Sequence, residues 1–461
     1  MRADSLPGIS GRTWKIAAVT GAGAFMAMLD ATVANLAIEA IRRDFGVSLA
    51  LVQWVATGYL VALAVSLPVA GWLGRRHGYG RLWSAAMVLF VFGSVGCALA
   101  PGPWNLIGAR VLQGLAAGLM VPAGQAVIGS MADSRQLGRL MGTLGLVVAL
   151  GPAVGPGLGG LLLEIASWRW LFWINVPVGI AALLIARPLV PGGDTDPHSP
   201  LDGRGLLLIV AGLPALLYGA MRLGAHGVET VALSSVTLGI VLAAVFVWHA
   251  SRQRHPLIDV RLLHGRRFAA ATLTAGLAGA NMYGGLLVLP LYLQTAAHQS
   301  AASTGMQLLA MGLGSALMLP VAGALTDRLD ACRVAMVGAA LLALATLPLA
   351  LGVTLTRGEL AMLLVVRGAG LALAQMPAMT AAYTSVTRAQ MGDATTIVNV
   401  VQRTGGALGA IAMVVLLAQA ERAGESGPGS GGHGEAFLLL VLLAVAAIGS
   451  AAAIRPRRMA S

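Results

Sequence analysis

Gly71-Trp-Leu-Gly-Arg75-Arg76-His-Gly78 follows the second hydrophobic segment of this 461-residue chain, and Gly323-Ala-Leu-Thr-Asp327-Arg328 follows the tenth. The fourth and twelfth segments each carry an arginine, Arg110 and Arg367. Both matches are expected if segments 1–6 and 9–14 form two equivalent six-helix bundles and segments 7 and 8 are an inserted pair. A parallel repeat of this kind is typical of secondary transporters, whose substrate site lies near mid-membrane at the interface of the repeats.

The composition places this repeat in a membrane. Of the residues, 57% are hydrophobic and 10% are charged, whereas an ordinary soluble domain carries about 25% charged residues. The mean hydropathy is +0.81. An apolar segment of about 20 residues can span a bilayer. We identify 14 such segments, at 14–36, 50–73, 82–100, 105–128, 139–162, 169–189, 204–223, 229–250, 268–296, 303–325, 333–353, 359–383, 393–418 and 435–454. The chain is therefore predicted to be an all-α polytopic membrane protein, and a soluble enzyme, a disordered chain and a secreted disulfide scaffold are disfavoured.

The segments predict three parts of the chain. Residues 1–189 form an N-terminal six-helix bundle, residues 190–267 hold cytoplasmic linkers and inserted helices 7 and 8, and residues 268–461 form a C-terminal six-helix bundle. The connections are too short for a sizeable soluble domain. Basic residues precede the first segment as in a signal peptide, but no soluble domain follows it, so we expect a retained helix.

The net charge of +12 describes orientation and not a nucleic-acid partner. Of the 30 basic residues 29 are arginines, and they lie in short stretches between the apolar segments. With the N-terminus inside, 21 basic residues lie on the cytoplasmic side and 6 on the outside, as the positive-inside rule requires. We therefore expect a multi-pass protein of the bacterial plasma membrane with both termini in the cytoplasm, in contact with lipid and monomeric.

Signals of catalysis or of a cofactor are missing from the sequence. The eight histidines have no metal-ligand spacing, and no phosphate-binding Gly-Lys-Ser/Thr loop occurs. The two cysteines, Cys97 and Cys332, are expected near opposite membrane faces, so no disulfide is predicted. We expect no enzyme activity, no metal and no cofactor, and energy supplied by an ion gradient.

Several motifs together carry a resemblance to a known family. They are Leu29-Asp30-Ala-Thr32-Val33-Ala-Asn35, Gln53-Trp54-Val-Ala-Thr-Gly-Tyr59-Leu60, Arg110-Val-Leu-Gln113-Gly114, Gly151-Pro152-Ala-Val-Gly155-Pro156-Gly-Leu-Gly159-Gly160, Trp168-Arg169-Trp170 with Asn175-Val-Pro177-Val-Gly179, and His255-Pro256-Leu-Ile-Asp259. In this order and spacing, over nearly the whole chain, the sequence resembles the fourteen-helix drug:proton antiporter branch of the major facilitator superfamily. The resemblance implies export of small molecules by alternating access.

The chain departs from that family in the loop after its second segment. In the superfamily an Asp normally stands four residues after the first Gly of this motif, and here that position is Arg75. The second copy keeps its acid as Asp327, followed by Arg328. If the acid normally locks the outward-facing state by charge pairing, the N-terminal half must do so differently. We expect Gly71, Arg75, Arg76, Gly78, Gly323, Asp327 and Arg328 to act in gating.

Asp30 is the acidic residue that falls well inside a predicted span. An intramembrane carboxylate is costly, so it tends to be neutralised, paired or placed in a wet cavity. We expect Asp30 to bind a proton and to yield it as substrate binds; the alternative is a structural hydrogen bond to a neighbouring helix. Arg110 could pair with Asp30 and couple protonation to conformation, or it could anchor helix packing.

The motif in the fifth segment predicts a mechanical role. Gly151, Gly155 and Gly159 recur every four residues and form a smooth face for close helix packing. Pro152 and Pro156 permit bending, and Gly160 ends the motif. We expect this helix at the moving interface between the bundles; the alternative is static packing.

A central cavity between the halves needs polar and deformable side chains. The candidates are Gln53, Tyr59, Gln113, Asn281, Tyr283, Gln307, Gln375, Met376, Asn399 and Arg403. Many such residues in a bundle only form interhelical hydrogen bonds or packing.

The predicted function is proton-coupled export of hydrophobic, amphipathic or cationic compounds, with Asp30 as the proton site. One alternative is export of a single endogenous metabolite, such as an antibiotic or a siderophore. Uptake by symport and a non-transporting membrane sensor are further alternatives, and the retained acid and the fifth-segment motif disfavour both.

Overall fold

The computed structural model describes residues 9–133, 136–422 and 432–454, and in this part of the chain all regular structure is helical. The first ten α-helices and one 3₁₀ turn are α1 (Gly11–Leu36), α2 (Ile38–Phe45), α3 (Leu49–Val52), α4 (Trp54–Ser66), η1 (Leu67–Val69), α5 (Ala70–His77), α6 (Tyr79–Ala98), α7 (Pro103–Met131), α8 (Leu137–Ile165), α9 (Trp170–Trp173) and α10 (Asn175–Leu189). The others are α11 (Gly203–His226), α12 (Thr230–Arg252), η2 (Val260–His264), α13 (Arg266–Thr295), α14 (Ala301–Arg328), α15 (Ala331–Ala350), α16 (Arg357–Thr384), η3 (Arg388–Gln390), α17 (Met391–Arg422) and α18 (Gly432–Ala452).

Thirteen helical stretches in the described residues are long and apolar enough to cross a membrane. The remaining predicted span, 139–162, lies within α8, whose stretch Leu137–Val148 is also apolar. The expected all-α membrane fold is confirmed. The division into fourteen spans and the three predicted parts of the chain stay predictions.

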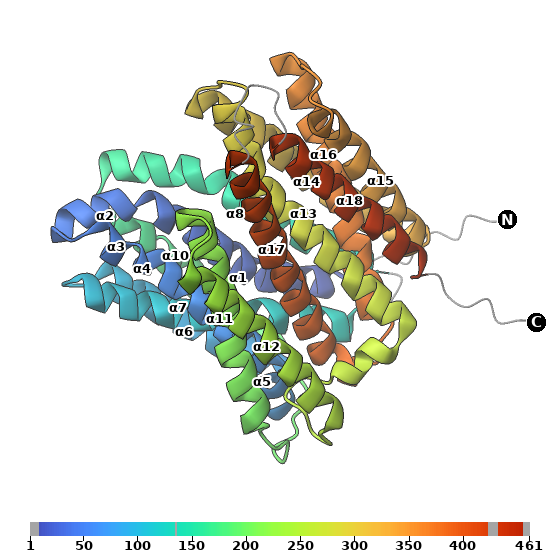
Figure 1. Cartoon of the computed structure of the whole chain (residues 1–461). Coiled ribbons are helices and arrows are strands. Elements are labelled where there is room, and N and C mark those ends of the chain that lie inside the picture. The colour runs from blue at the N-terminus through green and yellow to red at the C-terminus, as the bar shows by residue number, and fades with distance from the viewer. Residues whose placement is uncertain (1–8, 134–135, 423–431, 455–461) are drawn as a thin grey trace, which may run out of the picture.

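The helices pack in two groups. Helices α1 and α4–α10 contact one another, as do α13–α18. Figure 1 shows these groups on either side of the molecule, coloured blue to teal and yellow to red, with the green helices α11 and α12 alongside them. Helix α11 contacts α4 of the first group and α17 of the second. That α11 and α12 are an insertion between two equivalent bundles stays a prediction.

The second predicted span is interrupted in the structure. It comprises α4, the short 3₁₀ turn η1 and α5, and Pro68 lies in that turn. Proline lacks a backbone N–H and its ring clashes with the carbonyl of the preceding turn, so the α-helix gives way to a tighter turn here. Beyond this turn, α5 packs against α17 of the second group.

One large hydrophobic cluster marks what we call the terminal face, where α8, α13, α15 and α17 begin and α7, α16 and α18 end. It combines buried residues of both groups, from Ala17 near the start of α1 to Ile454 after α18. Helices α8 and α14, and α7 and α17, contact across the groups. The two groups are therefore joined by apolar packing at the terminal face.

Candidate functional site

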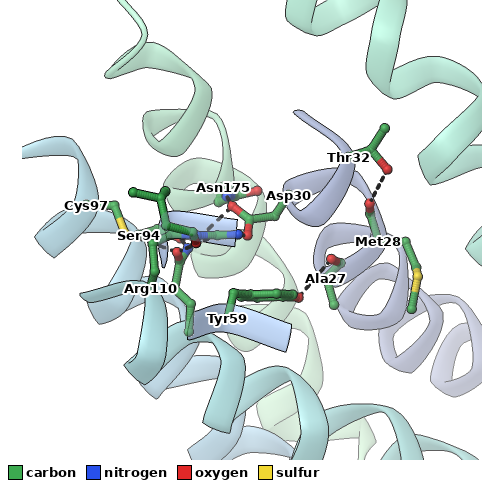
Figure 2. Close-up of polar contacts among 11 residues, drawn as sticks. Ala27, Met28, Asp30, Thr32, Tyr59, Ser94, Cys97, Arg110 and Asn175 are labelled. Atoms are coloured by element: carbon green, nitrogen blue, oxygen red, sulfur yellow. Dashed lines mark hydrogen bonds and ion pairs between the residues drawn. The ribbon is translucent and has the colours of Figure 1, made fainter. Parts of the chain in front are cut away.

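Asp30, in the second half of α1, lies at the centre of a buried polar cluster. Its residue surface is 2% exposed. Arg110 from α7 forms an ion pair with Oδ2, Asn175 Nδ2 from α10 donates to Oδ1 at 2.9 Å, and Gln113 Nε2 donates to Oδ1 at 3.4 Å. Figure 2 shows the side chains of Arg110 and Asn175 pointing toward the carboxylate. Donors and a cation around a buried carboxylate stabilise its ionised form.

Arg110 is held in place on several sides. It is 1% exposed, and its Nε donates to the carbonyl of Val55 at 3.1 Å. The guanidinium carbon lies 4.3 Å from the ring centroid of Tyr59, a distance typical of a cation–π contact. The Tyr59 hydroxyl in turn donates to the carbonyl of Ala27 at 2.9 Å. The ion pair therefore connects α1, α4, α7 and α10.

Gln113 extends the cluster to α6. Its Oε1 accepts from Arg110 at 3.0 Å and from the Cys97 thiol at 3.1 Å, and its Nε2 donates to Ser94 Oγ at 2.7 Å. A proton on Asp30 would remove the negative charge that holds the guanidinium. Loss of that charge would be felt through these bonds in five helices, namely α1, α4, α6, α7 and α10.

Arg367 of α16 lies at the centre of a buried polar cluster in the second group. It is 1% exposed, and its guanidinium donates to Asn281 Oδ1 at 2.8 Å and to Thr346 Oγ1 at 3.2 Å. Asn281 Nδ2 donates to the carbonyl of Leu440 at 2.7 Å. The buried arginine of the second group is therefore bound by an amide, Asn281, whereas Arg110 is bound by the carboxylate of Asp30. A carboxylate can bind a proton instead of a guanidinium, and an amide cannot.

One ion pair joins the groups at the start of α8. Asp327, at the end of α14, accepts from the backbone N–H groups of Gly138 at 2.8 Å and Arg139 at 2.9 Å. Arg139 Nε lies 3.1 Å from its Oδ2. The first N–H groups of a helix lack partners within the helix and carry partial positive charge, so α8 itself binds this carboxylate.

A second ion pair joins the groups at the start of α17. Arg75 of α5 pairs with Asp393. Further along the same helix, Asn399 Nδ2 donates to Gln125 Oε1 of α7 at 2.6 Å, and the Tyr383 hydroxyl donates to the same oxygen at 3.3 Å. Polar contacts therefore join the two groups on the terminal side as well.

The comparison with known proteins agrees with this architecture. The sequence profile of the Major Facilitator Superfamily matches residues 20–410. The chain belongs to the major facilitator superfamily. It is a multi-pass membrane transporter of small molecules, as members of this superfamily are.

Two relatives and one solved structure illustrate the membership. The multidrug resistance protein B homolog of Mycobacterium tuberculosis is 37% identical over 399 residues, covering 85% of this chain and 74% of that protein. The uncharacterized MFS-type transporter YcnB of Bacillus subtilis is 30% identical over 432 residues, covering 93% and 92%. The proton:xylose symporter XylE has a TM-score of 0.65 at 14% identity, covering 95% and 94%, which shows the fold alone.

Relative to the repeat that the sequence predicts, the two ion pairs have their acid and base exchanged. Gln136-Leu-Gly-Arg139 opens α8, and Gln390-Met-Gly-Asp393 precedes and opens α17 in the same register. The acid of one pair lies on α14 and its base on α8, whereas the base of the other lies on α5 and its acid on α17. Arg75 stands where the family resemblance leads us to expect an acid, and its partner in the structure is an acid of α17, Asp393.

The remaining residues of the two loop motifs surround these pairs. A Cβ on Gly71 would lie 3.0 Å from Asp393 Oδ1, and one on Gly323 would lie 2.2 Å from the carbonyl oxygen of Gly138. Gly78 has a φ of 87°, a conformation that glycine adopts readily. The Arg76 guanidinium carbon lies 5.6 Å from the Trp72 ring centroid, and Arg328 is exposed. Their part in gating stays a prediction.

The glycine stripe of α8 packs against α1 of its own group. A Cβ on Gly151 would lie 2.8 Å from Met28 Cβ, and one on Gly155 would lie 3.0 Å from Thr32 Cγ2. Gly159 lies against Leu36 in the same way. The sequence predicted a moving interface between the bundles for this motif, and the stripe itself faces within one group.

The contact of α8 with the second group uses other glycines. A Cβ on Gly138 would lie 2.5 Å from the carbonyl oxygen of Gly323, and one on Gly142 would lie 2.6 Å from that of Leu319. These glycines precede the predicted motif by about two and a half to three and a half helical turns. Gly160 has nothing within 4 Å of its Cβ position, and the side chains of Pro152 and Pro156 lie outside the part that the structure describes.

The cavity candidates lie in separate surroundings. Tyr59 and Gln113 belong to the Asp30 cluster, Asn281 to the Arg367 cluster and Asn399 to the contact with α7. The others are dispersed: Gln53 is exposed before α4, Tyr283 packs on Gly406, Gln307 donates to the Arg357 carbonyl at 3.0 Å, Met376 lies against Gly145, and Gln375 and Arg403 are half-buried. Their contact with substrate stays a prediction.

Sequence reasoning did not single out two residues of these sites. Asn175 belongs to one of the family motifs, but the sequence position of a neutral amide does not indicate which residue it contacts. Asp393 stands at the first position of a predicted span, and its place in the sequence alone does not pair it with Arg75. The match between the starts of α8 and α17 is the signal that could have identified it.

Proposed function

We propose that the protein is a proton-coupled exporter of hydrophobic, amphipathic or cationic compounds, working by alternating access in the bacterial plasma membrane with both termini in the cytoplasm. The observation that carries the proposal is the buried pair of Asp30 and Arg110, whose carboxylate can exchange a guanidinium for a proton. The name of the M. tuberculosis relative supports the class of substrate.

The proposed cycle uses the two groups as its moving parts. The contacts at the terminal face, which we take as cytoplasmic, correspond to a state closed on that side. Protons from outside would load Asp30 and release Arg110, and the loosened helices α1, α4, α7 and α10 would favour opening toward the cytoplasm. A compound would then enter, and release of the proton inside would restore the ion pair. Fourteen spans in two six-helix halves with an inserted pair fit this scheme.

Asp30→Asn separates the proposal from its alternatives. In a host lacking its own pumps, the wild type should raise the inhibitory concentration of several unrelated compounds, and Asp30→Asn should abolish this protection while still reaching the membrane. The control is Asp196→Asn, which changes an exposed acid of the loop before α11 and should protect fully. In everted vesicles, addition of substrate should release protons with the wild type only.

Other outcomes would contradict the proposal in distinct ways. Protection by Asp30→Asn equal to that of the wild type, driven by the proton gradient, would remove Asp30 as the proton site. Protection against one compound alone would favour a dedicated metabolite exporter. Increased sensitivity would indicate uptake, and no change with any compound would indicate a sensor.

A further inference from the structure

An apolar cavity of about 500 Å³ lies between the α11–α12 pair and the second group. This volume falls in the range of about 300–1,000 Å³ found for sites of drug-sized ligands. Its walls come from α11, α12, η2, α13, α17 and α18, with side chains such as Leu213, Phe246, Leu277 and Val401. Among the lining side chains that the structure describes, only Thr404 is polar.

Close helix contacts on both sides explain why this space remains. Helices α11 and α12 approach at Gly239, where a Cβ would lie 2.6 Å from the Leu216 nitrogen. Helices α13 and α17 approach at Gly405, where a Cβ would lie 2.3 Å from the Gly276 carbonyl oxygen. Each pair packs tightly within itself, and the gap between the pairs is the cavity.

The cavity opens sideways, toward the hydrocarbon around the bundle. Three of its lining residues remain exposed, namely Val247 at 48%, Leu273 at 54% and Leu408 at 42%. They lie on α12, α13 and α17, which therefore border the opening. In a membrane, apolar surface at such an opening contacts acyl chains.

A basic loop closes the cavity at the terminal face. Within residues 252–267 there are five arginines and one acid, Asp259. Val260 and Leu263 of this loop line the cavity, whereas Arg261 and Arg266 are exposed. The Nε of Arg267 is buried and has no hydrogen-bond partner in the described part of the chain. One loop thus presents apolar side chains inward and guanidinium groups at the membrane–water boundary.

The loop is fixed to both α11 and α12 by Asp202. The carboxylate accepts from His249 Nε2 at 2.9 Å, from the Gly205 N–H at 2.9 Å and from the Leu257 N–H at 3.3 Å. Burial raises the pKa of Asp202, but the hydrogen bonds from His249, Gly205 and Leu257 outweigh it, so the pKa lies below its ordinary value. The basic loop of residues 252–267, which forms the rim of the cavity, is therefore held in a fixed position against α11 and α12.

We propose that this cavity binds an anionic phospholipid of the leaflet at the terminal face, with an acyl chain between α12 and α13 and the phosphate at the arginines of residues 252–267. The apolar walls fit a hydrocarbon chain, and the charge of the rim complements a phosphodiester. A cationic or neutral compound would gain nothing from this rim. The lipid would fill the gap between the α11–α12 pair and α13, holding the pair against the second group.

Binding of defined lipids to the purified full chain tests the site. Delipidated protein is titrated with dioleoyl phosphatidylglycerol or dioleoyl phosphatidylcholine, and bound lipids are counted by native mass spectrometry. The anionic lipid should occupy one tight site that the zwitterionic lipid does not. Ala243→Phe, which fills the cavity, should lose it, whereas Ala244→Phe, on the exposed side of the same helix, should keep it.

The rim is tested with a matched pair of double variants. Each basic residue near an anionic lipid contributes about 1 kcal/mol, so Arg254→Gln with Arg266→Gln should weaken the anionic site about 30-fold. Arg187→Gln with Arg333→Gln removes the same charge from exposed positions outside the loop and should leave the site unchanged. Thermal unfolding of all variants confirms that they are folded.

Three results would overturn the proposal. The first is equal binding of the two lipids by the wild type. The second is equal loss of the lipid in Ala243→Phe and Ala244→Phe, or in both arginine pairs. The third is loss of export-substrate binding in Ala243→Phe with the lipid retained, which would make the cavity a port for substrate. Because lipid is counted without transport, these results are independent of the proposed export.

Discussion

Asn175 is the residue whose removal most directly tests the exchange of guanidinium for proton. Its amide donates to Asp30 Oδ1 at 2.9 Å, and a hydrogen bond to a charged group is worth about 1.5–3 kcal/mol. In Asn175→Ala the pair of Asp30 and Arg110 loses this support. The pH at half-maximal proton-driven transport should therefore differ from that of the wild type by about one to two units.

A neighbouring variant controls for general disturbance of the cluster. Ser94→Ala removes the acceptor of Gln113 at 2.7 Å and leaves the donors to the carboxylate in place. Its pH profile should stay within a few tenths of a unit of the wild type. A profile of Asn175→Ala that coincides with that of the wild type would show that the amide does not act on proton uptake.

Asn281 accepts a hydrogen bond from Arg367, a buried cation whose hydrogen-bond partners are neutral. Asn281→Leu would leave Arg367 without its 2.8 Å acceptor, and an unsatisfied buried charged group costs about 3 kcal/mol. The melting temperature in detergent should fall by several degrees. Asn281→Asp provides a carboxylate at the same place and should retain most of the stability. Equal melting temperatures for the two variants would contradict this account of Arg367.

At this scale the sequence identifies the charged residues in the middle of the spans, but it does not show which amides contact them. Asp30 and Arg110 could be identified because an ionisable side chain in an apolar span is expensive and therefore rare. Asn175 and Gln113 could not be assigned to them, because neutral amides are common in helices and their partners depend on how α1, α6, α7 and α10 are packed.

At the scale of the element, the glycines of α8 differ in how closely a neighbouring helix packs against each of them. A Cβ on Gly151 would lie 2.8 Å from Met28 Cβ and 3.0 Å from the Leu29 backbone nitrogen. Gly151→Ala should therefore destabilise the protein by about 1–3 kcal/mol through overpacking. Gly160→Ala faces open space and should be neutral or stabilising by up to about 1 kcal/mol.

Chemical or thermal unfolding of the two variants in the same detergent measures this difference. Equal destabilisation would mean that the motif acts through backbone flexibility and not through contact with α1. If transport falls in Gly160→Ala while its stability is unchanged, the end of the motif has a role in motion.

The positions of the helices in the sequence were easier to predict than the contacts between helices. The long apolar runs located the spans, because crossing a bilayer requires about 20 apolar residues in succession. The break at Pro68 and the partner of the α8 stripe were not predicted. A four-residue glycine spacing shows that some helix approaches closely, but both α1 and α14 contact α8, and only packing decides which glycines each one meets.

On the scale of the whole molecule, the two exchanged ion pairs join the groups. Arg75→Asp would place two carboxylates together at the start of α17, and Asp393→Arg would place two guanidinium groups there. Each single variant should favour opening of the terminal face. Arg75→Asp with Asp393→Arg should restore the closed state, with a coupling energy of about 0.5–3 kcal/mol.

Distances between spin labels on the two groups, measured at the terminal face, report the populations directly. The Arg139→Asp and Asp327→Arg variants form a second cycle, in which recovery should be weaker. The reason is that Asp327 also accepts from the backbone at the start of α8, and an arginine cannot replace those bonds. Additive effects of Arg75→Asp and Asp393→Arg would show that they do not act as a pair.

The sequence predicts a repeat, because two loop motifs and two intramembrane arginines recur at matching places. The sequence does not predict that acid and base are exchanged between the two ion pairs. That exchange appears only when each loop motif is compared together with the start of the helix that it contacts, α17 for Arg75 and α8 for Asp327. Facing segments lie far apart in the chain: Arg75 and Asp393 are separated by 318 residues.

The exchanged pairs also limit how halves can be recombined. A chimaera that joins residues 1–189 of this protein to the C-terminal half of a superfamily member with a basic residue at the start of α17 would set that residue against Arg75. The reverse chimaera would bring the usual loop acid against Asp393. The charge at position 75 of the first group must therefore be opposite to the charge at position 393 of the second group. A functional hybrid needs both residues of this pair to come from the same protein.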